Sequence, residues 1–208
     1  MKLYCGTYAK YNEGSLKGEW VDLDNFSNAD DFLAYCSKLH NDEKFPEFMF
    51  QDYECLFDWE KNLYCECSVS NDYWEIKNEL DRLNVDDELF DAWINAASKK
   101  PTADEVQNAQ DNFIYHGLLE DYMEEIAEEC GDIPEKYRFY IDWEKMARDE
   151  SFYYNIYDDY IFIGWFFSVS VFYGGYRILK GVLLMSKWQK IKRVNFSVCW
   201  KISRIREF

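Results

Sequence analysis

The chain has 208 residues, of which 48% are hydrophobic and 20% aromatic, and this composition excludes a disordered polypeptide although 30% of the residues are charged. The formal net charge of −17 excludes a protein that holds nucleic acid or anionic lipid on a basic surface. The charge is divided unevenly, because residues 1–159 contain 39 acidic and 14 basic residues (net −25), whereas residues 160–208 contain 1 acidic and 9 basic residues (net +8).

The first part of the chain predicts a small α+β unit. Residues 3–8 and 20–23 have the composition of strands, and the glycine-containing stretch between them favours a hairpin. Ser27 followed by Asp30 resembles a capping box. The apolar residues that follow recur at helical spacing: Phe32, Tyr35, Cys36 and Leu39. Residues 47–55 alternate as a returning strand would, so a helix is expected to pack on the sheet.

The middle of the chain predicts helices. Its apolar residues recur at helical spacing over two segments: Trp74, Leu80 and Leu83, then Leu89, Phe90, Trp93, Ile94 and Ala97. Residues 98–101 interrupt this pattern. Thr102 can cap a third helix that carries Val106, Ala109 and Phe113.

Residues 117–135 predict an amphipathic helix with one apolar and one acidic face. The apolar face holds Leu119, Tyr122, Met123, Ile126 and Cys130. The acidic face holds Asp121, Glu124, Glu125 and Glu128. Like charges at these spacings destabilise a helix by roughly 0.2–0.5 kcal/mol per pair, so a compensating interaction is expected. Residues 137–150 then predict an extended piece followed by a helix capped by Asp142, and residues 153–163 predict a strand.

The sequence contains no convincing active site. His40 and His116 have no neighbours at the spacing of metal ligands or of a catalytic dyad. Cys65 and Cys67 are too close in sequence for the usual zinc or redox spacing. Acids that could hold Mg²⁺ or Ca²⁺ are abundant, but no calcium-binding loop pattern is present. We therefore expect neither an enzyme, nor a cofactor, nor a metal.

The seven cysteines and the start of the chain bear on its location. The cysteines lie on apolar-patterned segments, and no secretory leader precedes the first strand pattern. Reduced thiols in the cytoplasm are therefore expected.

The density of negative charge indicates one possible partner. Double-stranded DNA carries one negative charge per ~1.7 Å of axis, so 25 net charges would imitate about 42 Å of duplex, roughly 12 base pairs, if spread along a rod. A protein groove built to hold phosphates would attract such a surface. The plainer interpretation is that the acids keep the protein soluble.

Three separated blocks carry a family resemblance: "GTYAKYNEGSLKGEWVDL", "DDFLAYCSKLHNDEKFPEFMFQDYE" and "YHGLLEDYMEEIAEECGDIPEKYRFYIDWEKMARDE". In this order they resemble the ArdA family of antirestriction proteins across roughly residues 3–163. The resemblance implies a non-enzymatic, elongated, acidic homodimer that imitates bent B-form DNA. Such proteins, typically encoded on mobile genetic elements, occupy the DNA-binding cleft of type I restriction-modification enzymes, formed by their methyltransferase core. They bind the enzyme and not nucleic acid.

The resemblance also implies a chain of small domains. N-terminal and C-terminal α+β units, each with a short antiparallel sheet, would flank a central helical unit. The expected boundaries are 1–60, 61–101 and 102–163, followed by an atypical basic and aromatic extension, 164–208. In this scheme the hairpin is a scaffold, and Tyr4, Tyr8 and Trp20 are expected to form its rigid core.

Candidate acids for the enzyme-facing surface lie in two helical regions. They are Asp81, Asp86, Asp87, Glu88 and Asp91 in the central helices, and Asp121, Glu124, Glu125 and Glu128 further on. The second set overlaps the region of the family's antirestriction motif, near the dimer contact. It could imitate phosphates, or it could be a solvated flank beside a dimer seam made by Leu118, Leu119, Tyr122 and Ile126. The alternative for the central set is an ordinary helix surface.

The extension leaves a second function open. Residues 160–176 carry no charge and would reach about 26 Å as a helix, just short of the ~30 Å membrane core. A membrane location is not favoured, because basic residues 187–193 would place the acidic body across the bilayer from any restriction enzyme. Residues 194–203 alternate as a strand would. The alternative function is an acidic interaction protein or membrane-anchored protein that keeps the fold without antirestriction activity.

Overall fold

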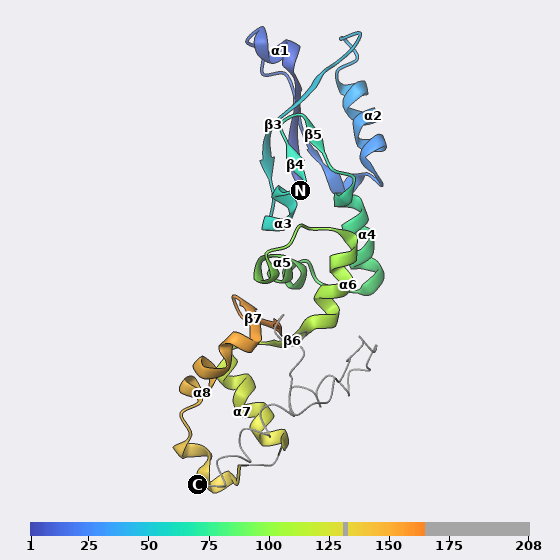
Figure 1. Cartoon of the computed structure of the whole chain (residues 1–208). Coiled ribbons are helices and arrows are strands. Elements are labelled where there is room, and N and C mark those ends of the chain that lie inside the picture. The colour runs from blue at the N-terminus through green and yellow to red at the C-terminus, as the bar shows by residue number, and fades with distance from the viewer. Residues whose placement is uncertain (131–132, 165–208) are drawn as a thin grey trace, which may run out of the picture. The chain divides into compact units, whose positions relative to one another are not determined.

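A computed structural model describes residues 1–130 and 133–164 of the chain (Figure 1). The chain divides into two compact units, Met1–Asn112 and the part that begins at Phe113. Each unit combines helices with a short three-stranded antiparallel sheet, so the α+β class predicted from the sequence is confirmed. The finer division, with boundaries after residues 60, 101 and 163, stays a prediction.

The first unit is built on a sheet of order β2-β1-β3, in which both neighbours run antiparallel to β1. The hairpin between β1 and β2 is confirmed, but Tyr8 does not belong to its strand. It begins a short helix, α1, which Thr7 caps by accepting a hydrogen bond from the backbone N–H of Lys10 at 3.4 Å. The bounds are β1 Lys2–Thr7, α1 Tyr8–Asn12, β2 Glu19–Asp22 and β3 Phe48–Glu54.

Helix α2 (Ala29–Leu39) lies along one side of this sheet (Figure 1). The fully buried ring of Phe32 contacts the buried ring of Phe50 at 5.5 Å between centroids. The predicted capping box at Ser27 is wrong by one residue, because Asn28 is the N-cap and accepts from the backbone N–H of Asp31 at 2.9 Å. A short 3₁₀ helix, η1 (Leu23–Asn25), connects β2 to α2.

The core of the hairpin is aliphatic rather than aromatic. Leu3, Cys5 and Val21 are buried, whereas Tyr4 is half-buried and Trp20 is 42% exposed. Successive residues of a strand point to opposite faces of the sheet, so Tyr4 and Trp20 share the outer face. Their rings meet edge to face at 5.5 Å between centroids. The prediction of a core made by Tyr4, Tyr8 and Trp20 is therefore wrong.

The remainder of the first unit is the one-turn helix α3, a small hairpin and the three longer helices α4, α5 and α6. The buried rings of Trp59, Tyr73 and Phe90 pack together there, with centroids 5.5–5.8 Å apart. The apolar spacing predicted these three longer helices and not α3, and Phe113, assigned to the third of them, does not belong to it. The bounds are α3 Asp58–Lys61, β4 Tyr64–Cys65, β5 Ser68–Val69, α4 Asp72–Leu83, α5 Asp87–Ala97 and α6 Ala103–Asn112.

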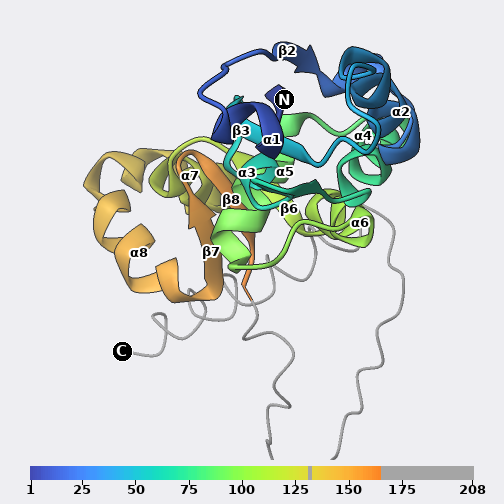
Figure 2. The ribbon, with the colours of Figure 1, turned by 90° about the horizontal axis from the view of Figure 1, so that it is seen from above.

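The second unit has the sheet order β6-β8-β7, and all pairs are antiparallel. Helices α7 and α8 pack on the sheet (Figure 2), and the core joins Tyr122, Met123 and Ile126 of α7 to Ala147 and Ile161. Phe113 begins β6 and pairs with Phe162. The bounds are β6 Phe113–His116, α7 Leu119–Cys130, η2 Glu135–Tyr140, α8 Trp143–Glu150, η3 Ser151–Tyr153, β7 Tyr154–Tyr157 and β8 Tyr160–Ile163.

Two further expectations for the second unit need correction. Residues 153–163 form a hairpin instead of one strand, because Asp158 turns the chain with φ 47 between β7 and β8. The piece expected to be extended before α8 is the 3₁₀ helix η2.

The C-terminal part of the sequence bears on the membrane hypothesis. In the two described ranges, no helix is both long and apolar enough to cross a membrane. Residues 160–163, which opened the candidate span, form the strand β8. The remainder of that span, the strand expected at 194–203 and nearly all of the 164–208 extension lie outside the described residues.

Candidate acidic partner-binding surfaces

The connection between α4 and α5 brings four of the predicted acids onto one surface. Asn84 follows α4 in the left-handed conformation (φ 52), which Asn tolerates better than most residues, and the chain reverses there. A groove of about 340 Å³ lies at this reversal. Its lining residues are Phe57, Leu80, Asp81, Asn84, Val85, Asp86, Asp87 and Glu88. We refer to Asp81, Asp86, Asp87 and Glu88 as the central acidic surface.

Three of these acids present unmatched negative charge. Asp81, Asp86 and Glu88 are exposed and form no ion pair with any residue that the structure describes. Asp86 is the N-cap of α5, yet its carboxylate makes no capping hydrogen bond. Glu88 lies in the first turn of α5, where the helix dipole stabilises an acid by about 0.3–1 kcal/mol. The helix therefore tolerates this crowding of acids at its N-terminus.

Asp87 and Asp91 are engaged inside the first unit. Asp87 accepts a hydrogen bond from Nζ of Lys77 at 2.9 Å, which joins α4 to α5. Oδ1 of Asp91 accepts from the backbone N–H of Trp59 at 2.9 Å, and its Oδ2 accepts from Nδ2 of Asn95 at 3.1 Å. Burial raises the pKa of Asp91, and the neighbouring Asp58 adds to this shift. Asp91 therefore holds α3 against α5, so we leave it out of the proposed surface.

The acidic face of α7 borders a second groove, of about 320 Å³, beside the start of α8. Two predicted residues, Asp121 and Glu124, line this α7–α8 groove. Three further acids that were not among the predicted partner-binding residues also line it, namely Glu120, Asp142 and Glu144. Asp142 was expected as a cap, and it does accept from the backbone N–H of Lys145 at 2.9 Å. Its place beside α7 depends on tertiary packing, for which the sequence gives no signal.

The remaining acids of α7 face solvent. Glu125 and Glu128 are exposed. Nη1 of Arg138, from η2, donates to Oε1 of Glu128 at 2.8 Å. This ion pair is the kind of compensation that the repulsion along α7 led us to expect, although an exposed pair contributes only about 0–1 kcal/mol.

The apolar residues proposed for a dimer contact have different environments. Tyr122 and Ile126 are buried in the core of the second unit, and Leu119 packs against the same cluster. Leu118 precedes α7 and is 52% exposed. Of the four residues, Leu118 alone therefore offers a largely accessible apolar side chain for a second copy of the chain.

A separate cluster of metal-ligand-type side chains surrounds the ammonium group of Lys10. The ligand-type atoms of His40, Asp42 and Glu43 lie within 4.8 Å of one another. Nζ of the buried Lys10 lies 2.8 Å from Nδ1 of His40, 2.8 Å from Asp42 and 3.0 Å from Glu43. Nε2 of His40 lies 3.2 Å from the carbonyl oxygen of Cys5, which can only accept, so we assign the imidazole proton to Nε2. The Lys10 ammonium thus takes the place of a metal ion.

The acids are concentrated at the molecular surface. Among those that the structure describes, only Glu60 and Glu150 are buried. The carboxylate of Glu60 accepts from the amino group of Met1 at 3.1 Å and from the backbone N–H of Leu56 at 3.0 Å. The remaining acids project an excess of negative charge, because residues 1–159 hold 39 acidic and only 14 basic residues.

Comparison with known proteins identifies the family. The family model for antirestriction protein (ArdA) matches residues 3–162, which include both acidic grooves. A search of curated proteins gave no match. Because the match spans most of the sequence and both three-stranded sheets, the chain belongs to the ArdA family of antirestriction proteins.

Proposed function

We propose that the protein inhibits a type I restriction-modification enzyme by imitating B-form DNA in the cleft of its methyltransferase core. The protein binds the enzyme and not nucleic acid, catalyses no reaction and acts in the cytoplasm. One observation carries the proposal: nearly all the described acids lie at the surface, and Asp81, Asp86 and Glu88 stand without cation partners around one groove. A cleft that binds phosphates is the complementary surface for such a row of carboxylates.

The proposal assigns different roles to the predicted acids. Asp81, Asp86 and Glu88 face the enzyme, while Asp87 supports them through Lys77. Asp121 and Glu124 contribute from the α7–α8 groove. Helices and caps hold these side chains on ordered backbone, which limits the entropy lost on binding. Two copies of the chain associate through Leu118 and neighbouring residues, and this doubles the length of DNA that can be imitated.

A displacement assay tests the proposal. A fluorescent duplex is bound to the methyltransferase core of a type I enzyme, and the full chain is titrated in while anisotropy is recorded. We expect displacement at micromolar concentration or below, with an affinity that falls steeply as salt rises. Failure to displace the duplex at any accessible concentration would reject the proposal.

Matched variants test the assignment of the central acidic surface. Replacing Asp81, Asp86 and Glu88 by Asn, Asn and Gln removes three charges that face the groove. A control removes three exposed charges elsewhere, through Glu13→Gln, Asp30→Asn and Glu47→Gln. We expect the first variant to lose about tenfold more affinity than the control, because local charge complementarity exceeds the effect of net charge. Equal losses of affinity in the two variants would reject the assignment of the binding surface without contradicting DNA mimicry itself.

A further inference from the structure

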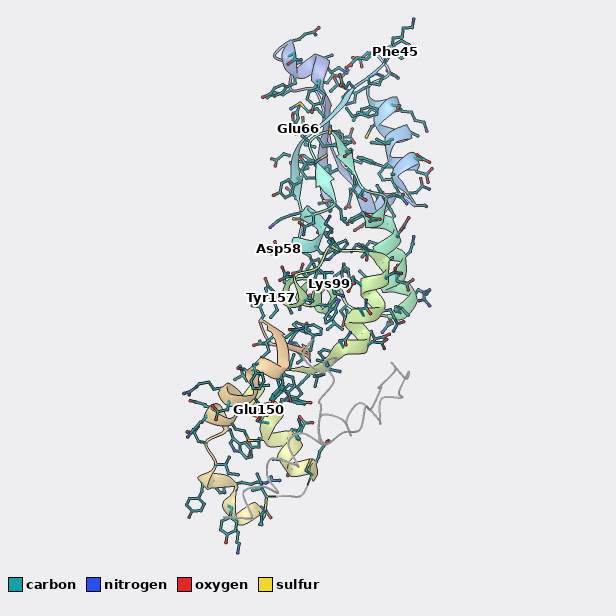
Figure 3. All side chains as sticks on the ribbon, viewed as in Figure 1. Phe45, Asp58, Glu66, Lys99, Glu150 and Tyr157 are labelled. Carbon is teal, nitrogen blue, oxygen red and sulfur yellow. The ribbon has the colours of Figure 1, made fainter. Side chains whose placement is uncertain are left out.

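The hairpin β4–β5 carries two cysteines at its turn. Cys65 ends β4 and pairs with Ser68 of β5, so Glu66, which is labelled in Figure 3, and Cys67 form the turn between them. The two Sγ atoms lie 3.6 Å apart, and both cysteines are exposed. The hairpin is anchored, because the carbonyl oxygen of Glu66 accepts from the backbone N–H of Phe50 at 2.7 Å. The hairpin thus holds the two thiols in contact, although their spacing in the sequence is shorter than the usual redox spacing and predicted no such site.

The other described cysteines are less accessible. Cys5 and Cys36 are buried, and Cys55 and Cys130 are half-buried. Burial raises the pKa of Cys55, which keeps its thiol protonated. In the described part of the chain, Cys65 and Cys67 are therefore the only pair of exposed thiols in contact with each other.

The two thiols differ in their hydrogen bonds. Sγ of Cys65 lies 2.9 Å from Oγ of Ser68 and also contacts Cys67. The Ser68 hydroxyl and then the Cys67 backbone and thiol lower the pKa of Cys65, whereas the hydrogen bond to Cys65 raises the pKa of Cys67. A cysteine with a lowered pKa in contact with a second thiol is the arrangement in which the first cysteine attacks a disulfide and its neighbour resolves the product.

We propose that Cys65 and Cys67 form a thiol–disulfide exchange site that takes small disulfides, cationic ones in preference. In the first step the Cys65 thiolate attacks one sulfur of the small disulfide RSSR. This forms a Cys65–S–S–R bond and releases RS⁻. The Cys67 thiol then gives its proton, through solvent, to the released RS⁻, and the resulting Cys67 thiolate attacks Sγ of Cys65. This releases the second RS⁻, which takes a proton from solvent. The protein dithiol is oxidised to a Cys65–Cys67 disulfide, and RSSR is reduced to two thiols.

The preference for cationic disulfides follows from the charge around the site. Glu66 lies between the two cysteines, and Asp52 and Glu54 of the neighbouring strand β3 are exposed. An acidic surface concentrates cations and repels anions. Cystamine, a dication, should therefore react faster than glutathione disulfide, which is an anion.

The test uses the full chain with Cys199→Ser, which removes a cysteine outside the described residues. Protein is treated with cystamine near neutral pH, the remaining thiols are alkylated, and the products are mapped by mass spectrometry. We expect loss of two thiols, a disulfide between Cys65 and Cys67, and no bound cysteamine. Glutathione disulfide should react at least about threefold more slowly at low salt, and this difference should shrink as salt rises.

Three variants separate the roles of the residues. Cys67→Ser should trap a mixed disulfide on Cys65, and Cys65→Ser should react about tenfold more slowly. Ser68→Ala keeps both thiols but removes the hydrogen bond that lowers the pKa of Cys65, so it should react more slowly near neutral pH. Its rate should approach that of the parent as the pH rises and Cys65 ionises without this help. The proposal is overturned if the parent keeps both thiols, if its disulfide maps elsewhere, or if Cys65→Ser reacts as fast as Cys67→Ser. Inhibition of a restriction enzyme is not measured, so this result is independent of the proposed function.

Discussion

Nζ of Lys77 lies 2.9 Å from Oδ1 of Asp87, so an ion pair fixes α4 against the first turn of α5. Both side chains are only about 30% exposed, and the ammonium group also lies 5.7 Å from the ring centroid of Trp59. Burial lowers the pKa of Lys77, but the Asp87 carboxylate outweighs burial and the net shift is upward. Asp87 is therefore engaged in holding the fold, in contrast to the neighbouring acids Asp86 and Glu88, which have no such partner among the described residues.

Replacing Lys77 by Met should destabilise the first unit. The substitution leaves the Asp87 carboxylate without its cation and removes the contact with Trp59, so we expect the free energy of unfolding to fall by about 1–2 kcal/mol. Urea unfolding followed by tryptophan fluorescence measures this change. Lys61→Met is the control, because its i,i+3 pair with Asp58 is largely exposed and should change stability by less than about 0.5 kcal/mol.

Asp91 should prove important for stability rather than for binding. Asp91→Ala leaves the backbone N–H of Trp59 without its acceptor, and we expect a loss of about 1–3 kcal/mol in unfolding free energy. Asp91→Asn keeps an oxygen acceptor and removes a partly buried charge, so its stability should stay close to that of the parent. Denaturant titrations of both variants decide the matter. If Asp91→Asn loses as much as Asp91→Ala, the charge itself matters and this explanation is wrong.

The Lys10 cluster should make stability depend on acid pH. Hydrogen bonds from Lys10 and then Lys17 lower the pKa of Asp42, and those from Thr7 and then Lys10 lower the pKa of Glu43. Because the folded carboxyl pKa values are depressed, their stabilising contribution is complete above the unfolded values of about 4–4.5 and is lost as pH falls below them. The melting temperature should therefore fall between about pH 5 and pH 3.

A variant isolates this contribution. Lys10→Met removes the shared cation, so it should melt at a lower temperature near neutral pH and show a shallower dependence on acid pH. Thermal unfolding of both proteins across this range checks the prediction. Parallel curves for parent and variant would show that other carboxylates cause the acid sensitivity.

Leu118 should contribute to self-association. Leu118→Asp places a charge at a 52% exposed position, so we expect a shift of the sedimentation profile from dimer to monomer without loss of thermal stability. Leu16→Asp is the control, because Leu16 is 70% exposed in the first unit and carries no predicted contact. A monomeric parent protein, or a dimer unaffected by Leu118→Asp, would contradict this assignment.

Helical periodicity made the positions of most helices predictable, whereas the contacts between distant parts of the chain could not be predicted. The apolar spacing along α4, α5 and α7 was sufficient to place these helices. The buried face of β1 was predicted wrongly: the sequence favoured Tyr4 for the core, whereas Leu3 is the residue that is buried. Both side chains are compatible with a core, and only tertiary packing distinguishes the two faces of the strand. Phe113 fitted the helical spacing of α6, but its pairing with Phe162 overrides that local preference.

The sequence predicted that the candidate surfaces lie on acid-rich helices. It did not predict which of these acids are exposed and which are engaged inside the fold. Sequence alone treats Asp86 and Asp91 alike, although one is exposed and the other accepts a hydrogen bond from a residue 32 positions away. Asp142 and Glu144 join Asp121 only because α8 packs on α7. Contacts of this kind leave no periodic signal in one sequence.

The two faces of α7 have a consequence for mutational screens. Tyr122, Met123 and Ile126 are interleaved along the helix with Asp121, Glu124 and Glu125. A screen that scores only survival of unmodified phage DNA in cells would report low scores at both kinds of position. At the first kind the cause would be low abundance, and at the second it would be weak inhibition by a normally accumulated protein. Quantifying the protein level of each variant is therefore the step that makes such a map interpretable.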